Sequence, residues 1–397
     1  MPNQNAYIVE ALRSPLTRGR KDGGFAQMHP IDLGEAVVKD LIKRSGLSKP
    51  EAVEDIIFGC ATPVGEQGFN IARSIARRGI GNSVPGFQVN RLCGSGAEAV
   101  DIASSKIMSG NYDLIIAGGV ESMSRVPMGA DMLPVPSSLG IIWKIISMGK
   151  KAARLTRPDD LKVTPMGISA ELISEKYGFS RRELDEFSYS SHIKAANAQK
   201  NGYFEKEIVE IQTQKGLIKK DEGIRANTTV EKMGALIPAF KKDGVITAAN
   251  ASQITDGAAA LLIASEKAIK EYNLKPRAKI VSCHVVGSDP TLQLTGPIDA
   301  IPKILKKASL TINDIDLFEI NEAFASVVLA TIKECKLDIN KVNVNGGAIA
   351  LGHPLGCSGA RLLVTLLHEL ERRKLKRGLS VLCTAGGQAT ATIIERI

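Results

Sequence analysis

Residues 93–119 read CGSGAEAVDIASSKIMSGNYDLIIAGG, which is a turn of small residues, a helical pattern, a polar turn and an apolar strand that ends in two glycines. Residues 356–387, GCSGARLLVTLLHELERRKLKRGLSVLCTAGG, repeat this order. A second pair, 32–59 and 299–320, shares another order, in which an apolar-periodic helix and a small-residue turn precede a β-rich run. Two matching pairs far apart in one chain predict a duplicated fold.

The strands expected in these repeats are short, continuous apolar runs. DIIFG, DLIIAGG, DLFEI and LSVLCTAGG each adjoin a helical pattern, which is typical of βαβ units in largely parallel sheets covered on both faces. The pattern loosens at about 121–247 into proline breaks and separate helical pieces, which indicates an inserted lobe. It resumes at NASQITDGAAALLIASEKAI. We therefore expect an α/β chain with two domains, 1–272, which contains the insertion, and 273–397.

The composition argues against several classes of protein. The chain has 397 residues, 44% of them hydrophobic, without an apolar run long enough to span a membrane. Its six cysteines are scattered and form neither a CxxC pair nor part of an HExxH helix, so we expect reduced thiols and no metal site. The net charge of +9 suits a polyanionic ligand, but only 4% of the residues are aromatic, which disfavours nucleic acid. No signal-like segment opens the sequence, so the expected location is the cytoplasm.

Cys93 stands where an extended pattern gives way to a helical one. If the CGSG turn opens the helix, the thiol lies at a helix N-terminus, where unpaired N–H groups and the helix dipole favour an anion. Such a position lowers the pKa of a cysteine, and the adjacent glycines let a substrate approach the backbone. The plainer alternative is a small buried cysteine at a strand-to-helix junction.

Three more polar residues fall at strand ends or in the turns after them. His353 lies in the loop NGGAIALGHPLGCSGAR, where Pro354 argues against a helix that would pair the histidine with Cys357 as metal ligands. Asn321 follows DLFEI, and Cys383 ends LSVLC. Taken singly, they fit a turn histidine, a helix N-cap and a strand-end cysteine. In a duplicated fold they can converge with the cysteine of the CGSG turn, and such a set supports acyl transfer through a thioester.

With these motifs in place, the sequence resembles the thiolase family, the acyl-CoA C-acyltransferases that cleave or form 3-oxoacyl-CoA. The landmarks, in the family's order, are NRLCGSG, GGVESMSRVPM, DEGIRANTTVEKM, ANASQITDGAAA, NEAFA and GGAIALGHPLGCSGAR. The resemblance covers essentially the whole chain and implies a duplicated five-layer αβαβα fold with an inserted loop domain. Cys383 and NEAFA argue against a decarboxylating or HMG-type condensing enzyme, which can share this fold.

The resemblance also implies roles for the polar residues. Cys93 matches the nucleophile that becomes acylated, His353 the base that activates it, and Cys383 the second acid/base, which handles the proton at C2 of the acetyl unit. Asn321 would position a water that forms, with His353, an oxyanion hole for the enolate. The N–H groups of Cys93 and Ala385 would form the other hole. Ala385 replaces a glycine of the family's C-x-G-x-G pattern, so a positive φ there would introduce strain.

Coenzyme A (CoA) would be a substrate of such an enzyme, and the resemblance implies no cofactor. Arg225 matches a position near the adenine of CoA, and Ser252 matches one that contacts the pantetheine. The other matching positions would line the pocket, and they are Met166, Phe240, Ala248 and Phe324. Taken singly, each of these residues is better explained by surface charge or core packing.

The motifs favour the degradative class of thiolases. TPMG, with Pro165 before Met166, stands where acetoacetyl-specific members often have HMG. The expected reaction is therefore thiolytic cleavage of 3-ketoacyl-CoA to acetyl-CoA and a shortened acyl-CoA, through acyl-Cys93, in fatty-acid β-oxidation. The alternatives are an acetoacetyl-CoA thiolase, that is, an acetyl-CoA C-acetyltransferase running in the condensing direction, and a non-catalytic scaffold with the thiolase fold.

The partners expected from the resemblance are CoA, acyl-CoA and further copies of the chain in a homodimer or homotetramer. Some degradative members also join an enoyl-CoA hydratase/3-hydroxyacyl-CoA dehydrogenase. Residues 137–157 form a basic amphipathic segment with the single tryptophan of the chain. Such a segment can contact an anionic membrane or a partner, or simply cover the acyl pocket.

Overall fold

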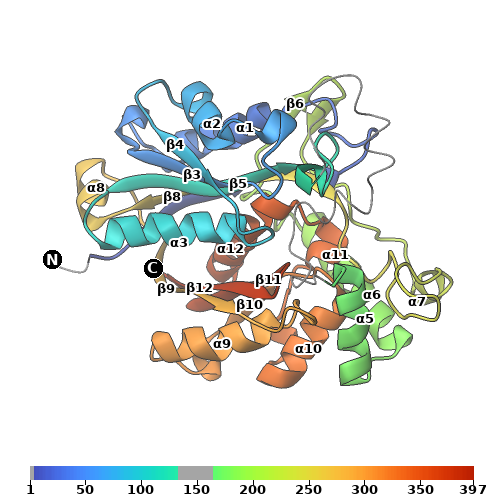
Figure 1. The fold of residues 1–397 in the computed structure, drawn as a ribbon. Helices are drawn as coiled ribbons and strands as arrows, with labels where there is room; N and C mark the ends of the chain where they lie inside the picture. The colour runs from blue at the N-terminus through green and yellow to red at the C-terminus, as the bar shows by residue number, and fades with distance from the viewer. Residues whose placement is uncertain (1–3, 133–163) are drawn as a thin grey trace.

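The computed structural model describes residues 4–132 and 164–397 (Figure 1). The predicted amphipathic segment 137–157 lies outside the described residues. The principal helices are α1 (Pro30–Ser45), α2 (Ile71–Gly79), α3 (Ser95–Met108), α5 (Met166–Tyr177), α6 (Arg181–Lys200), α7 (Val230–Gly234), α8 (Glu266–Glu271), α9 (Gly296–Lys307), α10 (Ala325–Cys335), α11 (Ala348–Leu351) and α12 (Leu355–Arg373). Single 3-10 turns occupy Pro50–Ala52, Gly65–Gln67, Ala130–Met132, Ile312–Asp314 and Ile339–Lys341. No described helix is long and apolar enough to cross a membrane.

One mixed sheet supplies the strands of both halves. Its strands are β1 (Tyr7–Arg13), β2 (Thr17–Arg18), β3 (Asp55–Gly59), β4 (Gly86–Val89), β5 (Leu114–Ser122), β8 (Thr255–Ala264), β9 (Ala278–Gly287), β10 (Leu317–Ile320), β11 (Arg377–Thr384) and β12 (Gln388–Arg396). They follow the order β10-β11-β12-β9-β1-β8-β5-β3-β4, with β2 paired to β8. The halves meet where Tyr7 and Ile8 of β1 pair with Lys279 and Ala278 of β9.

The elements stack in five layers (Figure 1). Helices α1 and α2 cover the first half of the sheet, and α9 and α10 cover the second. Helices α3 and α12 form the middle layer, where α12 packs on β5 and β8 on one side and on β10 and β11 on the other. This αβαβα arrangement is the one that the resemblance implied.

The sequence repeats correspond to equivalent parts of the two halves. Helix α1 precedes β3 as α9 precedes β10, and α3 precedes β5 as α12 precedes β11. Strand β8 and helix α8 then follow in the stretch where the pattern was expected to resume. The duplicated α/β fold predicted from the sequence is therefore confirmed.

The expectation of largely parallel sheets is wrong. Strand β3 runs parallel to β4 and β5, and β10 runs parallel to β11. The pairs β1–β8, β1–β9, β5–β8, β9–β12 and β11–β12 are antiparallel. Strands β11 and β12 are joined by the turn 385–387, which is too short for the crossover that parallel neighbours need. A buried strand has the same continuous apolar sequence whether its neighbours run parallel or antiparallel to it. The sequence pattern therefore did not distinguish the two kinds of pairing.

The two middle helices touch backbone to backbone near their first turns. A Cβ on Gly96 would lie 2.7 Å from the carbonyl oxygen of Gly356, and a Cβ on Gly359 would lie 2.3 Å from the nitrogen of Ala97. Further along, apolar side chains of both helices, such as Val100 and Leu363, fill one core with those of the strands. The N-termini of α3 and α12 are thereby brought side by side.

Helix α12 begins directly after Pro354, so no helix pairs His353 with Cys357, as the proline predicted. Cys357 lies inside it, and His353 lies outside, before its first turn. Proline is well tolerated at the start of a helix because the first N–H groups have no intrahelical partner. The histidine is therefore held at the N-terminus of a long buried helix.

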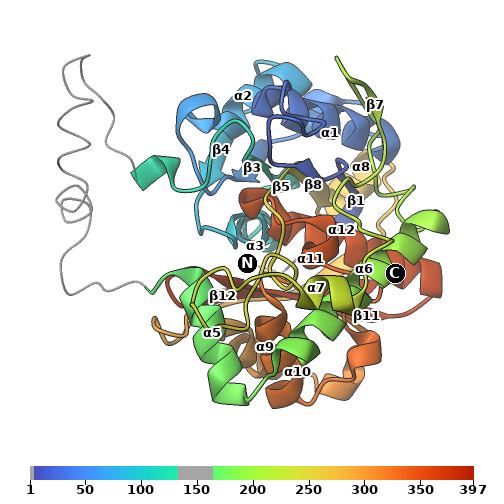
Figure 2. The same cartoon turned by 90° about the vertical axis from the view of Figure 1, so that its right-hand side faces the viewer.

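The inserted segment packs against the second half of the molecule. Figure 2 shows α5 and α6 beside α9 and α10, and a small hairpin of β6 (Ile211–Thr213) and β7 (Gly216–Ile218) follows α6 in the chain. Buried Arg13 of β1 binds Glu207 at 2.6 Å and Asp221 at 2.7 Å, which ties the segment to the first half as well. The predicted boundary between 272 and 273 lies in the connection from α8 to β9.

Candidate active site

Cys93 lies in the connection from β4 to α3, directly before the N-cap residue Gly94. The helix thus starts where the CGSG pattern predicted. Leu92, just before the cysteine, has a left-handed backbone with a φ of 49°. The sharp bend of the chain at this point carries the thiol to the end of α3.

The resting thiol of Cys93 is protonated. Burial raises its pKa to about 11, although the N–H groups of Ala385 and of Cys93 itself favour the thiolate. The lowered pKa expected from the helix N-terminus is therefore wrong for the resting site, because desolvation of the charge outweighs the helix end. A nucleophile with a raised pKa needs a base beside it.

His353 is held as a neutral base between α11 and α12. Its Nδ1 lies 2.6 Å from the Ser358 hydroxyl, and this hydroxyl donates its single proton to the carbonyl of Pro354 at 2.8 Å. The hydroxyl must then accept from Nδ1–H, which leaves Nε2 free to take a proton. Burial, with the charge of Arg361 in addition, lowers the pKa of His353 to about 3.

Asn321 follows β10 and meets the free side of the histidine. Its Nδ2 lies 3.3 Å from Nε2 of His353. The N-cap of α10 is Phe324, so the N-cap role considered for Asn321 is wrong. Its Oδ1 is buried without a hydrogen-bond partner among the described residues. The amide oxygen is therefore available to a polar group that enters the site.

Cys383 lies near the end of β11 and is 1% exposed. Burial raises its pKa, and the charge of a Cys93 thiolate raises it further, so Cys93 is close enough to affect the ionisation of Cys383. Ala385, in the turn that follows, does not have a positive φ. The strain considered for this alanine does not arise, because Gly386 and Gly387 take the left-handed conformations, with φ of 82° and 77°.

One cavity of about 270 Å³ brings the two cysteines and the histidine together. Four of the predicted CoA contacts also line it, namely Met166, Phe240, Ser252 and Phe324. The remaining lining is mostly apolar and consists of Met123, Met128, Pro165, Gly167, Ala251, Gln253, Ile254, Leu294, Ala323 and Leu355. Asn321 is not part of this lining and reaches the site through its contact with the histidine.

A second cavity, of about 410 Å³, adjoins the first and shares Ser252, Gln253 and Ile254 with it. We call it the arginine cavity, because Arg18, Arg20 and Arg225 line it. Ala248 lines it as well, so all six positions predicted to contact CoA line one of the two adjoining cavities. Arg18 and Arg20 were not among the predicted positions, although the basic run TRGRK was an available signal for them.

Two buried carboxylates, also missed, hold the loops of the site. Glu121, at the end of β5, accepts the N–H groups of Ala61 and Gly356, each at 2.8 Å, and so ties the first half to the first turn of α12. Glu322 accepts the N–H of Ile349 at 3.1 Å and thereby fixes the helix α11 that precedes the histidine. For Glu121 the signal was a single charged residue in the otherwise uncharged stretch 114–124, and for Glu322 it was the NEAFA motif itself.

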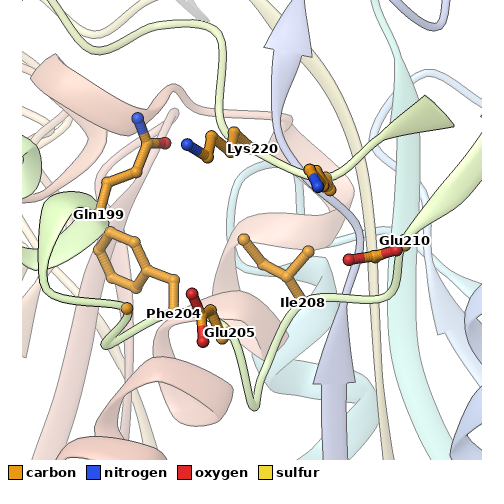
Figure 3. Close-up of a pocket in the computed structure, with 8 residues that line it drawn as sticks. Gln199, Phe204, Glu205, Ile208, Glu210 and Lys220 are labelled. Atoms are coloured by element: carbon orange, nitrogen blue, oxygen red, sulfur yellow. The ribbon is translucent and has the colours of Figure 1, made fainter. Parts of the chain in front are cut away.

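Figure 3 shows a different cavity, of about 340 Å³, in the inserted segment. Glutamates and lysines line it beside Phe204 and Ile208, and it contains neither a cysteine nor a histidine. Among the described residues, no cluster of three or more His, Cys, Asp or Glu side chains could hold a metal ion. The cysteine-lined cavity, in contrast, brings two thiols and an imidazole together.

Comparison with known proteins agrees with this geometry. Residues 6–267 match the protein family described as "Thiolase, N-terminal domain", and residues 274–396 match the family described as "Thiolase, C-terminal domain". The chain is 44% identical over 394 residues to the steroid 3-ketoacyl-CoA thiolase FadA6 of Mycobacterium tuberculosis, with 99% of this chain and 94% of that protein covered. It is 43% identical over 395 residues to a probable acetyl-CoA acyltransferase of Staphylococcus aureus, with 98% of both covered.

Solved structures give the same result. The human mitochondrial 3-ketoacyl-CoA thiolase in complex with CoA superposes with a TM-score of 0.88 at 36% identity and covers 100% of this chain and 99% of its own. The acetyl-CoA acetyltransferase of Bacillus anthracis superposes with a TM-score of 0.87 at 37% identity, with both chains covered in full. With these matches over its whole length, and with its two cysteines and histidine in one cavity, the chain belongs to the thiolase family of acyltransferases.

Proposed function

We propose that this thiolase cleaves 3-ketoacyl-CoA with CoA, which gives acetyl-CoA and a shortened acyl-CoA, as in fatty-acid β-oxidation. The observation that carries the proposal is the cavity lined by Cys93, His353 and Cys383, which adjoins the arginine cavity. The arginines suit the phosphate groups of CoA, and the apolar lining around the cysteines suits an acyl chain. CoA is a substrate in this scheme, and the enzyme uses no cofactor.

The first half of the reaction transfers the acyl group to the enzyme. Nε2 of His353 takes the proton of Cys93, and the sulfur attacks the C3 carbonyl. The resulting oxyanion is held by the N–H groups of Cys93 and Ala385, which also favour the thiolate form of Cys93 in the resting site. The carbonyl re-forms as the C2–C3 bond breaks, and Cys383 protonates C2 of the departing acetyl-CoA enolate. Acyl-Cys93 and a Cys383 thiolate remain.

The second half regenerates the thiols. The Cys383 thiolate takes the proton of an incoming CoA thiol, and the CoA sulfur attacks the acyl-Cys93 thioester. Collapse of the tetrahedral intermediate releases the new acyl-CoA, and Cys93 recovers its proton from His353. Asn321, beside the histidine, would hold a water at the enolate oxygen in the first half. Each fixed donor to an oxyanion lowers such a barrier by about 3 kcal/mol.

The pKa values of the resting site fit this order of events. Burial keeps both Cys93 and His353 neutral before substrate enters. When the sulfur attacks, His353 carries a positive charge and the negative charge passes to the C3 carbonyl oxygen, which has fixed N–H donors. The site thus stabilises charge in the transition state more than in the free enzyme.

Mass spectrometry tests the proposal. After incubation with an acyl-CoA, the Cys93 peptide should carry the acyl group, and Cys93→Ala should lose both the adduct and thiolysis. Persistent activity in Cys93→Ala without any adduct would remove the proposal. Loss of thiolysis in Cys93→Ala, with acylation of Cys93 in the native enzyme, would exclude the alternative of a non-catalytic scaffold. A native enzyme with neither adduct nor thiolysis would support that alternative.

The main alternative is an acetoacetyl-CoA thiolase that works in the condensing direction. The similarity to the acetyl-CoA acetyltransferase of Bacillus anthracis favours it, whereas the apolar cavity and the TPMG motif favour longer substrates. Thiolysis rates across 3-ketoacyl-CoA chain lengths decide between them. Activity confined to the four-carbon substrate would favour the alternative.

We also propose that the enzyme is a cytoplasmic homodimer or homotetramer. Strand β4 ends the described sheet as an unpaired edge, and Phe69 beside α2 is 99% exposed, so both suit a contact between copies. Light scattering of the purified protein tests this assembly. We further propose a hydratase/dehydrogenase partner, which a pull-down experiment tests. A membrane contact through residues 137–157 is also a proposal, and liposome sedimentation tests it.

A further inference from the structure

Helix α6 carries two adjacent buried side chains that serve different parts of the site. The hydroxyl of Ser191 donates to Glu322 at 2.7 Å and accepts the N–H of Gly347 at 3.0 Å. It thus supports the loop that leads to His353. The next residue, His192, is 2% exposed and contacts another loop.

His192 fixes the backbone at Arg225. Its Nδ1 accepts the N–H of Arg225 at 3.1 Å. Burial and then the charge of Arg225 lower the pKa of His192 to about 4, so the ring is neutral near pH 7 and Nδ1 keeps its lone pair. The Arg225 side chain is exposed and lines the arginine cavity. The histidine therefore acts on the main chain of a residue whose side chain faces the ligand.

The loop before Arg225 has an anchor of its own. The side-chain amide of Gln253 donates to the carbonyl of Gly223 at 2.9 Å. A Cβ on Gly223 would lie 2.6 Å from the carbonyl oxygen of Ala350, so this part of the loop packs directly on α11. Residues 226 and 227, beyond the arginine, are exposed. The histidine thus anchors the main chain of the loop at the arginine itself.

We propose that His192 is a positioning residue for CoA, which holds the main chain of Arg225 so that the guanidinium meets a phosphate group of the ligand. This inference rests on the proposed function, because it takes the arginine cavity to bind the phosphate end of CoA. His192 lines neither cavity. It therefore acts on the affinity for CoA and leaves the chemical step unchanged.

His192→Asn and His192→Leu form a matched pair for the test. The Oδ1 of asparagine takes the place of Nδ1 and still accepts the N–H, whereas leucine offers no acceptor. In thiolysis assays, His192→Leu should raise the KM for CoA about tenfold with kcat unchanged, as expected for one buried hydrogen bond. His192→Asn should stay within about threefold of the native KM. Pantetheine, an acceptor thiol without phosphates, should show the same KM with all three enzymes.

The role of Arg225 is tested by a double variant. In an Arg225→Gln background, His192→Leu should raise the KM for CoA no further, because the two residues act through one contact. Additive effects would overturn the inference, as would an unchanged KM for CoA in His192→Leu or an equal rise with pantetheine. If leucine prevents folding, His192→Phe, which keeps a ring without nitrogen, takes its place. Failure of the proposed function would show separately, as a native enzyme without acyl-Cys93.

Discussion

Ser358→Ala tests whether the tautomer of His353 limits turnover. In the native enzyme the hydroxyl accepts from Nδ1–H at 2.6 Å and donates to Pro354 at 2.8 Å, in a fully buried setting. Without it, Nδ1–H has no acceptor, which disfavours this tautomer by about 1–3 kcal/mol. The imidazole then carries its proton on Nε2 and cannot accept one from Cys93. We expect kcat to fall roughly tenfold to a hundredfold.

The chain offers a matched control for this variant. Ser188 on α6 is also fully buried, and its hydroxyl donates to the carbonyl of Leu184 at 2.7 Å, one helical turn earlier, without contact to a histidine. Ser188→Ala therefore removes the same kind of bond as Ser358→Ala. Rapid-quench measurement of acyl-Cys93 formation, with melting curves of both variants, separates the effects. If Ser358→Ala forms the adduct within twofold of the control, the tautomer argument is wrong.

Three further measurements test the site. Alkylation of Cys93 by iodoacetamide should accelerate with pH up to about 10, because burial raises the pKa to about 11 and the thiol is protonated below it; a plateau below about pH 8 would contradict this. Cys383→Ala should slow thiolysis by a factor on the order of 10²–10⁴ but leave alkylation of Cys93 nearly unchanged, and an equal loss of both would indicate a structural role. Arg20→Gln should raise the KM for CoA severalfold at low salt and less at high salt, since its side chain is exposed; a salt-independent KM equal to that of the native enzyme would remove Arg20 from the CoA site.

The parts of the fold that depend on local pattern could be predicted. The spacing of apolar residues predicts the alternation of α3 with β5 and of α12 with β11, and it also predicts the duplication. Strand direction could not be predicted in this way, because it depends on which distant strand lies alongside. Strand β8, for example, pairs antiparallel to β1 and β5, which are far from it in the chain.

The site was predictable where a side chain stands in a distinctive motif. Cys93, His353 and Cys383 line one cavity as the duplicated motifs suggested. The pKa of Cys93 was not predictable, because burial depends on what covers the thiol and not on its neighbours in sequence. Ser358 was missed for a related reason, since its role follows from a bond to a ring that only the folded loop brings near.

The narrow pairing between β1 and β9 bears on how the protein unfolds. Among the described residues, only a few backbone hydrogen bonds can join β1 to β9. The two halves therefore contact each other mainly through the helices that lie between them. Helix α12 packs against strands of both halves. Unfolding of either half would therefore expose buried apolar side chains of the other half to water. Heating should therefore produce one cooperative transition, with the calorimetric enthalpy per chain equal to the van't Hoff value when the assembly state does not change.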